Sequence, residues 1–379
     1  MTRGNQHWLF QRFMAWGCVV LLASLAACAS SASNTVAHTL TVTPQPAHAL
    51  TFYEGEDGEE PEPFTPFLVA NGPGSTVISF GFSQFEGAYY LTKYDASWGE
   101  RDISNGFQPS DPRWDCDQSP ETSIISPDTT FVARPCTDGS LTVFTASTAI
   151  EVFHRGETPG AAALGARIPV AAFAPDSHTV ALTNDGPGGP GQTITLFDTH
   201  TWAKGRTLTL TAGLLSRPGW SADGTRLAAV ALDGTLHIWN AQSGAEVAAM
   251  TIPRFAVGSA ASDPAGPAPQ WSPDGASLLV TSPGDVGTLL TVWAVQGSTL
   301  IPHASASVAS APDAANPQMA PDGQHIFLHT AAQHGQIFSA SDLHQVSDFA
   351  LAGNLTLWID ANHLAVFTLQ AVVVPMQIG

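Results

Sequence analysis

The sequence predicts an all-β fold that grows by repetition of a four-stranded unit, and three observations lead to this prediction. The chain contains 34 glycines and 28 prolines among 379 residues, a content that favours many turns over long helices. Hydrophobic residues make up 44% of the chain and charged residues only 12%, so it is not a charged disordered protein. Similar turn sequences recur along most of its length, and repetition lets a fold exceed the size at which a single core divides.

The beginning of the chain has the pattern of an export signal. Arg3 and Arg12 precede an apolar run over residues 13–27, which is shorter than the roughly 18 to 20 residues needed to span a membrane. The run ends in Leu25-Ala26-Ala27-Cys28, which resembles the lipobox of bacterial lipoproteins. The resemblance implies cleavage before Cys28 and attachment of lipid to its thiol. An ordinary signal peptide and a short uncleaved anchor are the alternatives.

This interpretation divides the chain into three segments. Residues 1–27 form a lipoprotein signal peptide, residues 28–37 a tether rich in Ser, Ala and Thr, and residues 38–379 the folded domain. The expected location is the bacterial cell envelope, outside the cytoplasm, with the lipid as the only membrane contact. Nucleic acid is not an expected partner, because phosphate binding needs clustered Lys and Arg and the formal charge is −19, from 13 basic and 32 acidic residues.

Two cysteines remain in the expected mature domain besides the lipid acceptor. Cys18 lies in the signal peptide, whereas Cys116 and Cys136 lie in the folded domain. An even pair outside the cytoplasm favours a disulfide between these two residues, with two free thiols as the alternative. A zinc site is disfavoured because no second cysteine pair or histidine cluster stands at ligand spacing.

One pattern recurs from residue 64 onward. An apolar strand leads through a Pro-Asp-Gly-like turn to a second strand, and an Asp-Gly-like turn leads to a third strand that ends in an aromatic residue and precedes a fourth. Residues 220–247 give the clearest copy. The first-turn aspartates stand 47 to 51 residues apart, at Asp128, Asp176, Asp223, Asp274 and Asp322.

The ends of the third strands add a family resemblance. Pairs such as Phe197-Asp198 and Trp239-Asn240 resemble the Trp-Asp ending of WD40 repeats, and the resemblance covers about residues 64–351. It implies a β-propeller, in which each four-stranded blade buries its two apolar faces against its neighbours in a ring. The Gly-His dipeptide that opens many WD40 units is absent, so the hydrogen-bond network associated with it is not expected.

The expected number of blades depends on how the two ends of the domain are used. Six blades are expected at about 64–105, 122–156, 170–211, 217–252, 268–302 and 317–351. Strands at 355–360, 363–369 and 371–378, joined by a strand at 38–43, would form a seventh blade. This closure is favoured because an incomplete ring exposes strand edges and blade faces. A six-bladed ring with a loose tail is the alternative.

Long loops are expected on one face of the disc. With the strands of a blade lettered a to d outward from the axis, this is the face of the b–c turns and the d–a links. The long segments there are 45–63, 106–121, 184–192, 253–267 and 303–316. Such loops commonly bind ligands, and they can equally be tolerated insertions.

Two of these segments are acidic and supply the candidate binding residues. These residues are Glu54, Glu56, Asp57, Glu59, Asp111, Asp115 and Asp117. A solvated charge run that keeps the protein soluble is the first interpretation. A calcium site at Asp111, Asp115 and Asp117 is the alternative, because calcium takes six to eight oxygen ligands and these three residues supply some of them.

Motifs of the common enzyme classes do not occur in the sequence. It contains no Gly-x-Ser-x-Gly, no His-Glu-x-x-His and no glycine loop followed by Gly-Lys-Ser/Thr. We therefore expect a non-catalytic scaffold that binds an envelope or extracellular protein, with no catalytic residue, cofactor or metal. The alternative is a hydrolase or lyase with its site near the central channel. Convergent polar groups at the channel would favour the enzyme, whereas an exposed apolar patch would favour a protein partner.

The lipid-anchor prediction can be tested at Cys28. Replacing the acceptor thiol, as in Cys28→Ser, should release the protein from the membrane fraction or leave the precursor uncleaved, because serine cannot form the thioether. Membrane fractionation together with intact-mass measurement checks this. Unchanged membrane partition with an unchanged mass contradicts the assignment.

Overall fold

The computed structural model describes residues 40–379 apart from a set of gaps, and these residues belong to one compact unit, His38–Gly379. The gaps are residues 50, 53–61, 64, 73–75, 84–87, 96–97, 99, 104–122, 137–139, 157–169, 187–188, 211, 215, 253–267, 286, 310–316, 331–333, 352, 354 and 369–371. Every regular element in the described part is a β-strand. No helix long and apolar enough to cross a membrane occurs among these residues.

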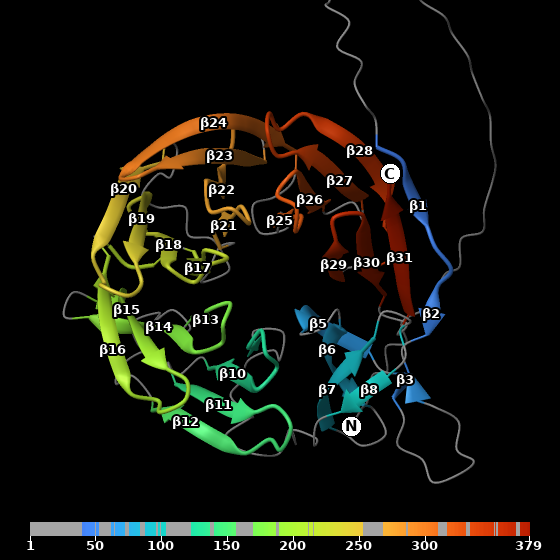
Figure 1. Cartoon of the computed structure of the whole chain (residues 1–379), viewed down its shortest axis with the longest axis horizontal. Coiled ribbons are helices and arrows are strands. Elements are labelled where there is room, and N and C mark those ends of the chain that lie inside the picture. The colour runs from blue at the N-terminus through green and yellow to red at the C-terminus, as the bar shows by residue number, and fades with distance from the viewer. Residues whose placement is uncertain are drawn as a thin grey trace, which may run out of the picture. The chain divides into compact units, whose positions relative to one another are not determined.

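The strands form seven antiparallel blades arranged in a ring, which confirms the predicted seven-bladed β-propeller (Figure 1). Blades 1 to 3 comprise β5 (Thr65–Gly72), β6 (Thr76–Ser83), β7 (Ala88–Tyr94) and β8 (Glu100–Ile103); β9 (Ile124–Ile125), β10 (Phe131–Pro135), β11 (Leu141–Thr145) and β12 (Glu151–Arg155); and β13 (Ala171–Phe173), β14 (Thr179–Gly186), β15 (Gly189–Asp198) and β16 (Lys204–Thr209).

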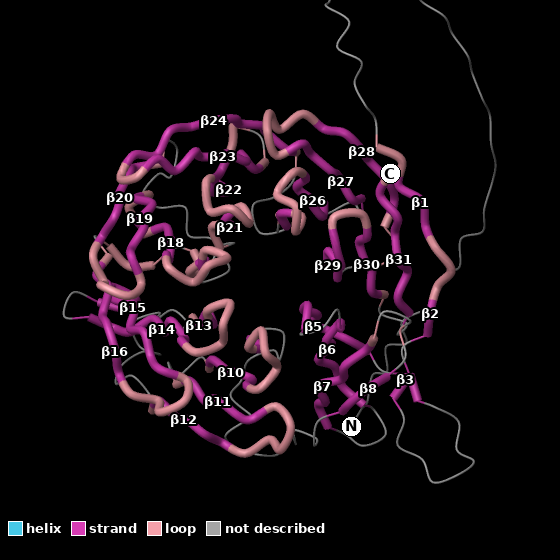
Figure 2. Tube along the Cα trace, viewed as in Figure 1, coloured by secondary structure: helices cyan, strands magenta, loops and turns pink. Residues whose placement is uncertain are grey.

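Blades 4 to 6 repeat this order. They comprise β17 (Gly219–Trp220), β18 (Arg226–Val230), β19 (Thr235–Asn240) and β20 (Glu246–Thr251); β21 (Gln270–Trp271), β22 (Ser277–Pro283), β23 (Thr288–Gln296) and β24 (Thr299–Val308); and β25 (Gln318–Met319), β26 (His325–Thr330), β27 (His334–Ser339) and β28 (Gln345–Ala350). In each blade the first strand lies nearest the axis and the fourth on the rim, as the tube in Figure 2 shows. A short pair, β3 (Thr51–Phe52) and β4 (Glu62–Pro63), lies outside the blades.

The seventh blade is assembled from both ends of the domain. Its inner strands are β29 (Leu355–Asp360), β30 (His363–Phe367) and β31 (Val372–Ile378), and β1 (Val42–Pro44) and β2 (His48–Ala49) pair antiparallel with β31 as the outermost strand. Val42 lies opposite Ile378, and the N–H groups of Thr41 and Gly379 each donate to the other residue's carbonyl at 2.7 and 3.0 Å. Pro44 fits this rim position because an edge strand can lack a donor on its outer side.

Seven apolar clusters among the described residues hold the ring together, and each one spans two adjacent blades. Ile78 of blade 1 packs with Phe144 of blade 2, and the succeeding clusters continue around the disc. The last cluster joins Val77 and Tyr94 of blade 1 to Phe367 of blade 7. Each blade therefore buries its two faces only because both neighbours are present.

Part of the expected loop at 45–63 forms β2, β3 and β4. Two further segments expected as loops are strands instead. Residues 184–192 belong largely to β14 and β15, whose ladder continues to Gly186 opposite Gly189. Residues 303–308 belong to β24, which pairs with β23 as far as Val308. Both segments lengthen a hairpin, because adjacent strands that continue in register satisfy their backbone groups with each other.

The closure of blade 7 predicts a cost for removing its rim strand. A domain that begins at Gln45 should unfold at least about 5 °C below one that begins at His38, because β31 loses its pairing with β1 and the cluster between blades 6 and 7 loses Leu40 and Val42. A domain that begins at Ala29 is the control, since the added residues are the expected tether. Equal midpoints of thermal unfolding for the two shorter domains would show that β1 does not stabilise the ring.

Candidate functional site

The site residues predicted from sequence lie mostly outside the described part of the chain. These residues are Cys28, Glu54, Glu56, Asp57, Glu59, Asp111, Asp115, Cys116 and Asp117. Cys136 is described, and it is buried at the start of the b–c turn of blade 2 with 2% of its surface exposed. The pairing of Cys136 with Cys116 stays a prediction, as does the calcium alternative.

The recurring aspartates organise the a–b turns. In blade 4 the Ser221 hydroxyl donates to Asp223 Oδ1 at 2.6 Å, and the Thr225 N–H donates to the same oxygen at 3.0 Å. Ser221 Oγ in turn accepts the Arg226 N–H at 2.9 Å, which joins the turn to the next strand. Blades 2 and 5 have the same serine-aspartate bond, from Ser126 to Asp128 and from Ser272 to Asp274.

These bonds favour the ionised form of Asp223 and Asp274. The Ser221 hydroxyl is the first cause that lowers the pKa of Asp223 to about 2, and the Thr225 N–H is the second. The Ser272 hydroxyl likewise lowers the pKa of Asp274. The carboxylates that mark the repeat in the sequence are therefore structural acceptors within their own turns.

Tryptophan side chains join the innermost strands of adjacent blades. The indole N–H of Trp220 donates to the Ala172 carbonyl at 3.0 Å, and that of Trp271 donates to the Gly219 carbonyl at 3.1 Å. The Trp358 indole N–H donates to the Gln318 carbonyl at 3.1 Å between blades 6 and 7. The tryptophans at these repeat positions therefore lie between blades, where each indole has one apolar body and one bonded N–H.

Blades 4 and 5 are also joined by an arginine that covers a tryptophan. The Arg226 guanidinium carbon lies 4.4 Å from the centre of the Trp271 ring, and Nη2 donates to the Gly275 carbonyl at 2.8 Å. Gly275 has a φ of 66°, a left-handed conformation that glycine adopts without strain, and a Cβ there would stand 2.3 Å from Nη2. Arg226 follows Asp223 by three residues, and Trp271 precedes Asp274 by three.

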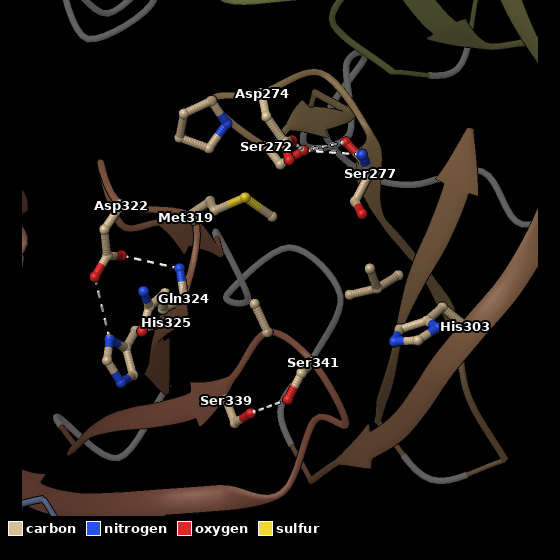
Figure 3. Close-up of a pocket in the computed structure, with 14 residues that line it drawn as sticks. Ser272, Asp274, Ser277, His303, Met319, Asp322, Gln324, His325, Ser339 and Ser341 are labelled. Carbon is tan, nitrogen blue, oxygen red and sulfur yellow. Dashed lines mark hydrogen bonds and ion pairs between the residues drawn. The ribbon is translucent and has the colours of Figure 1, made fainter. Parts of the chain in front are cut away.

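The corresponding positions between blades 5 and 6 carry smaller side chains. Ser277 stands where blade 4 has Arg226, and Met319 stands where blade 5 has Trp271. Met319 has no side-chain N–H, and the Gln270 side chain bridges the inner strands instead, with its Oε1 accepting the Met319 N–H at 2.8 Å. A cavity of about 590 Å³ lies at this boundary (Figure 3), a volume within the range of ligand sites.

The cavity is polar and has carboxylates in its wall. It is lined by the two a–b turns, by Val292 and His303, and by Ser339, Ala340 and Ser341 in the c–d turn of blade 6. Asp322 accepts the Gln324 N–H through Oδ1 at 2.9 Å, and its Oδ2 lies 3.9 Å from His325 Nδ1 (Figure 3). His303 is the extra residue of a bulge, since Val292 pairs with Ala304 and Trp293 with Pro302. No Lys or Arg is among the described residues that line it.

A second hollow of about 480 Å³ lies among the innermost strands of blades 2, 3 and 4. Its lining is mostly apolar, and Ile124, Ile125, Ala172 and Trp220 within it are half-buried. Arg217 is the single charged residue in the described lining. An apolar surface beside one cation suits a polypeptide better than a reaction that needs convergent polar groups.

The sequence contained a signal for the first cavity that the repeat pattern alone did not reveal. When the copies are compared position by position, Gln318-Met319 replaces the Gln270-Trp271 pair, and Ser277 replaces Arg226. Two large side chains are thus lost at one blade boundary. The cavity opens on the face of the a–b and c–d turns, opposite the face that the loop lengths favoured.

Comparisons with known proteins do not assign the chain to a family. The chain matches no protein-family model and no curated protein. Among the described residues, no group of three or more His, Cys, Asp or Glu side chains is placed to hold a metal ion.

The serine-aspartate bond predicts a pH-dependent contribution to stability. Ser221→Ala should lower the free energy of unfolding by about 1 kcal/mol at pH 7, and Ala174 and Ala320 show that the turn accepts alanine. Because the folded pKa of Asp223 is depressed, its contribution is fully present above the unfolded pKa near 3.8 and is lost as pH falls toward 2. The difference from wild type should therefore shrink below pH 4.

Urea unfolding at a series of pH values measures this effect. Ser307→Ala, on the exposed face of β24, is the control and should leave stability unchanged. A Ser221→Ala deficit that is constant from pH 7 to pH 3 would contradict the coupling to Asp223.

Proposed function

We propose that this chain is a non-catalytic scaffold that binds a protein partner at the bacterial cell envelope, where lipid on Cys28 anchors it. The seven-bladed disc offers a rigid frame, and propellers of this kind serve as interaction scaffolds or as enzymes. The observation that carries the choice is the apolar hollow among the inner strands of blades 2 to 4. Half-buried Ile124, Ile125 and Trp220 beside Arg217 form a surface that a partner's apolar side chains would cover.

The bonds made by the polar side chains support a binding function over a catalytic one. The repeated carboxylates accept bonds from their own turns, as Asp223 and Asp274 do, and so stabilise the blades. The Ser339 and Ser341 hydroxyls bond to each other at 2.9 Å. A disulfide between Cys116 and Cys136 belongs to the same proposal, since it would tie the acidic 106–121 segment to blade 2 outside the cytoplasm.

A capture experiment with charge-reversal variants tests the scaffold. The intact lipoprotein, cross-linked in cells and purified from solubilised envelopes, should bring down a defined protein in near-stoichiometric amount. Arg217→Glu should reduce this capture at least tenfold, because it reverses the charge beside the apolar hollow. Lys204→Glu, the same reversal on the exposed rim strand β16, should capture as wild type does.

Two outcomes would contradict the proposed scaffold function. One is that no protein is enriched over an unrelated lipoprotein. The other is that both variants capture the same proteins as wild type.

A further inference from the structure

The boundary between blades 4 and 5 is an internal template for the cavity between blades 5 and 6. In the template, the Arg226 guanidinium donates to the Gly275 carbonyl at 2.8 Å and lies over Trp271. The Gly275 N–H donates to the Ser272 carbonyl at 2.8 Å, which fixes the turn. One arginine head group thus fills the space between two a–b turns.

The acceptor side of this template is preserved in blade 6. Gly323 takes the place of Gly275, its φ is 70° against 66°, and its N–H donates to the Ala320 carbonyl at 2.8 Å. Equal turn geometry sets the Gly323 carbonyl in the same relation to its blade, and Gly323 lines the cavity. The other side of the boundary differs: Ser277 stands in place of Arg226, Met319 in place of Trp271 and Pro273 in place of Ala222. Pro273 lies against Gly323, since a Cβ built on Gly323 would stand 2.8 Å from the Pro273 Cδ.

The charges in the wall of the cavity between blades 5 and 6 also favour a cation. Asp322 and Asp274 are both in the wall, and no Lys or Arg is among the described lining residues. A guanidinium donates several N–H groups in one plane, so it can serve a carbonyl and a carboxylate together, which an ammonium does less well. Met319 provides an apolar wall for the methylene stem.

We propose that the cavity between blades 5 and 6 binds the guanidinium group of an arginine side chain supplied by a partner polypeptide, beside the turn that corresponds to the one that Arg226 contacts between blades 4 and 5. This rests on the proposed scaffold function for the source of the arginine. The recognition itself depends on the Gly323 carbonyl, the Asp322 carboxylate and the space left by Ser277 and Met319.

Calorimetric titration of the full-length protein in detergent at pH 8 tests the ligand class. The probes are acetyl-Gly-Arg-Gly-amide, its lysine and citrulline counterparts, and free L-arginine. The arginine peptide should bind at least tenfold more tightly than the lysine and citrulline peptides, because citrulline keeps the shape and loses the charge. Equal binding of all three peptides overturns the proposal, and so does binding of free arginine without binding of the peptide.

A variant that supplies the missing arginine tests the location. Ser277→Arg should reduce binding of the arginine peptide at least tenfold, because its own guanidinium occupies the cavity. Thr179→Arg is the matched control, since Thr179 holds the same repeat position in blade 3, away from the cavity, and should leave binding unchanged. Unaltered binding by folded Ser277→Arg overturns the location.

A second variant covers the case in which Ser277→Arg fails to fold. Asp322→Asn keeps the oxygen that accepts the Gln324 N–H and removes the charge, so binding should fall at least fivefold. Wild-type binding by this variant overturns the role of the carboxylate.

The outcomes separate this inference from the scaffold proposal. Capture of an Arg217-dependent partner without binding of the arginine peptide overturns the guanidinium site alone. Selective peptide binding without a captured partner supports the guanidinium site and counts against the scaffold.

Discussion

The burial of each blade between two neighbours is the constraint on which the rest of this molecule depends. A four-stranded blade has two apolar faces, and the seven clusters that cover them each draw residues from two adjacent blades. The indole bonds from Trp220, Trp271 and Trp358 add a directed contact at the inner strands. Because no blade can be stable alone, the ring must close, and its closure makes a rigid frame available for binding.

The same constraint explains why a change at one boundary has a local effect. Between blades 4 and 5, Arg226 and Trp271 fill the gap and bond across it. Between blades 5 and 6, the apolar cluster is kept, with Leu279, Ile326 and Phe338, while the position near the turns is vacated. Substitution outside the cluster therefore opens a cavity without loss of the packing that holds the blades together.

Much of the fold could be predicted from the sequence because turns and strand periods are local properties. The Asp-Gly turns and the strands that flank them lie where the repeat places them, and the expected seventh blade is present. The lengths of the hairpins at 184–192 and 303–308 could not be predicted, since strand pairing beyond a turn depends on the partner strand. The cavity was harder to predict than the hairpins. It results from the smaller side chains of Ser277 and Met319, compared with Arg226 and Trp271 at the same repeat positions.

The pairing of β1 with β31 also has a consequence for the order of events during synthesis. The Gln45 side chain bonds to Gln377, which is 332 residues later in the chain. The rim strand of blade 7 is thus among the first parts of the domain to be made, and it waits with an unpaired edge until the last strand is complete. Closure of so long a loop is slow compared with the formation of a single hairpin. A nascent chain cannot complete this ring before β31 has been synthesised. The ring therefore stays open while the six preceding blades are made.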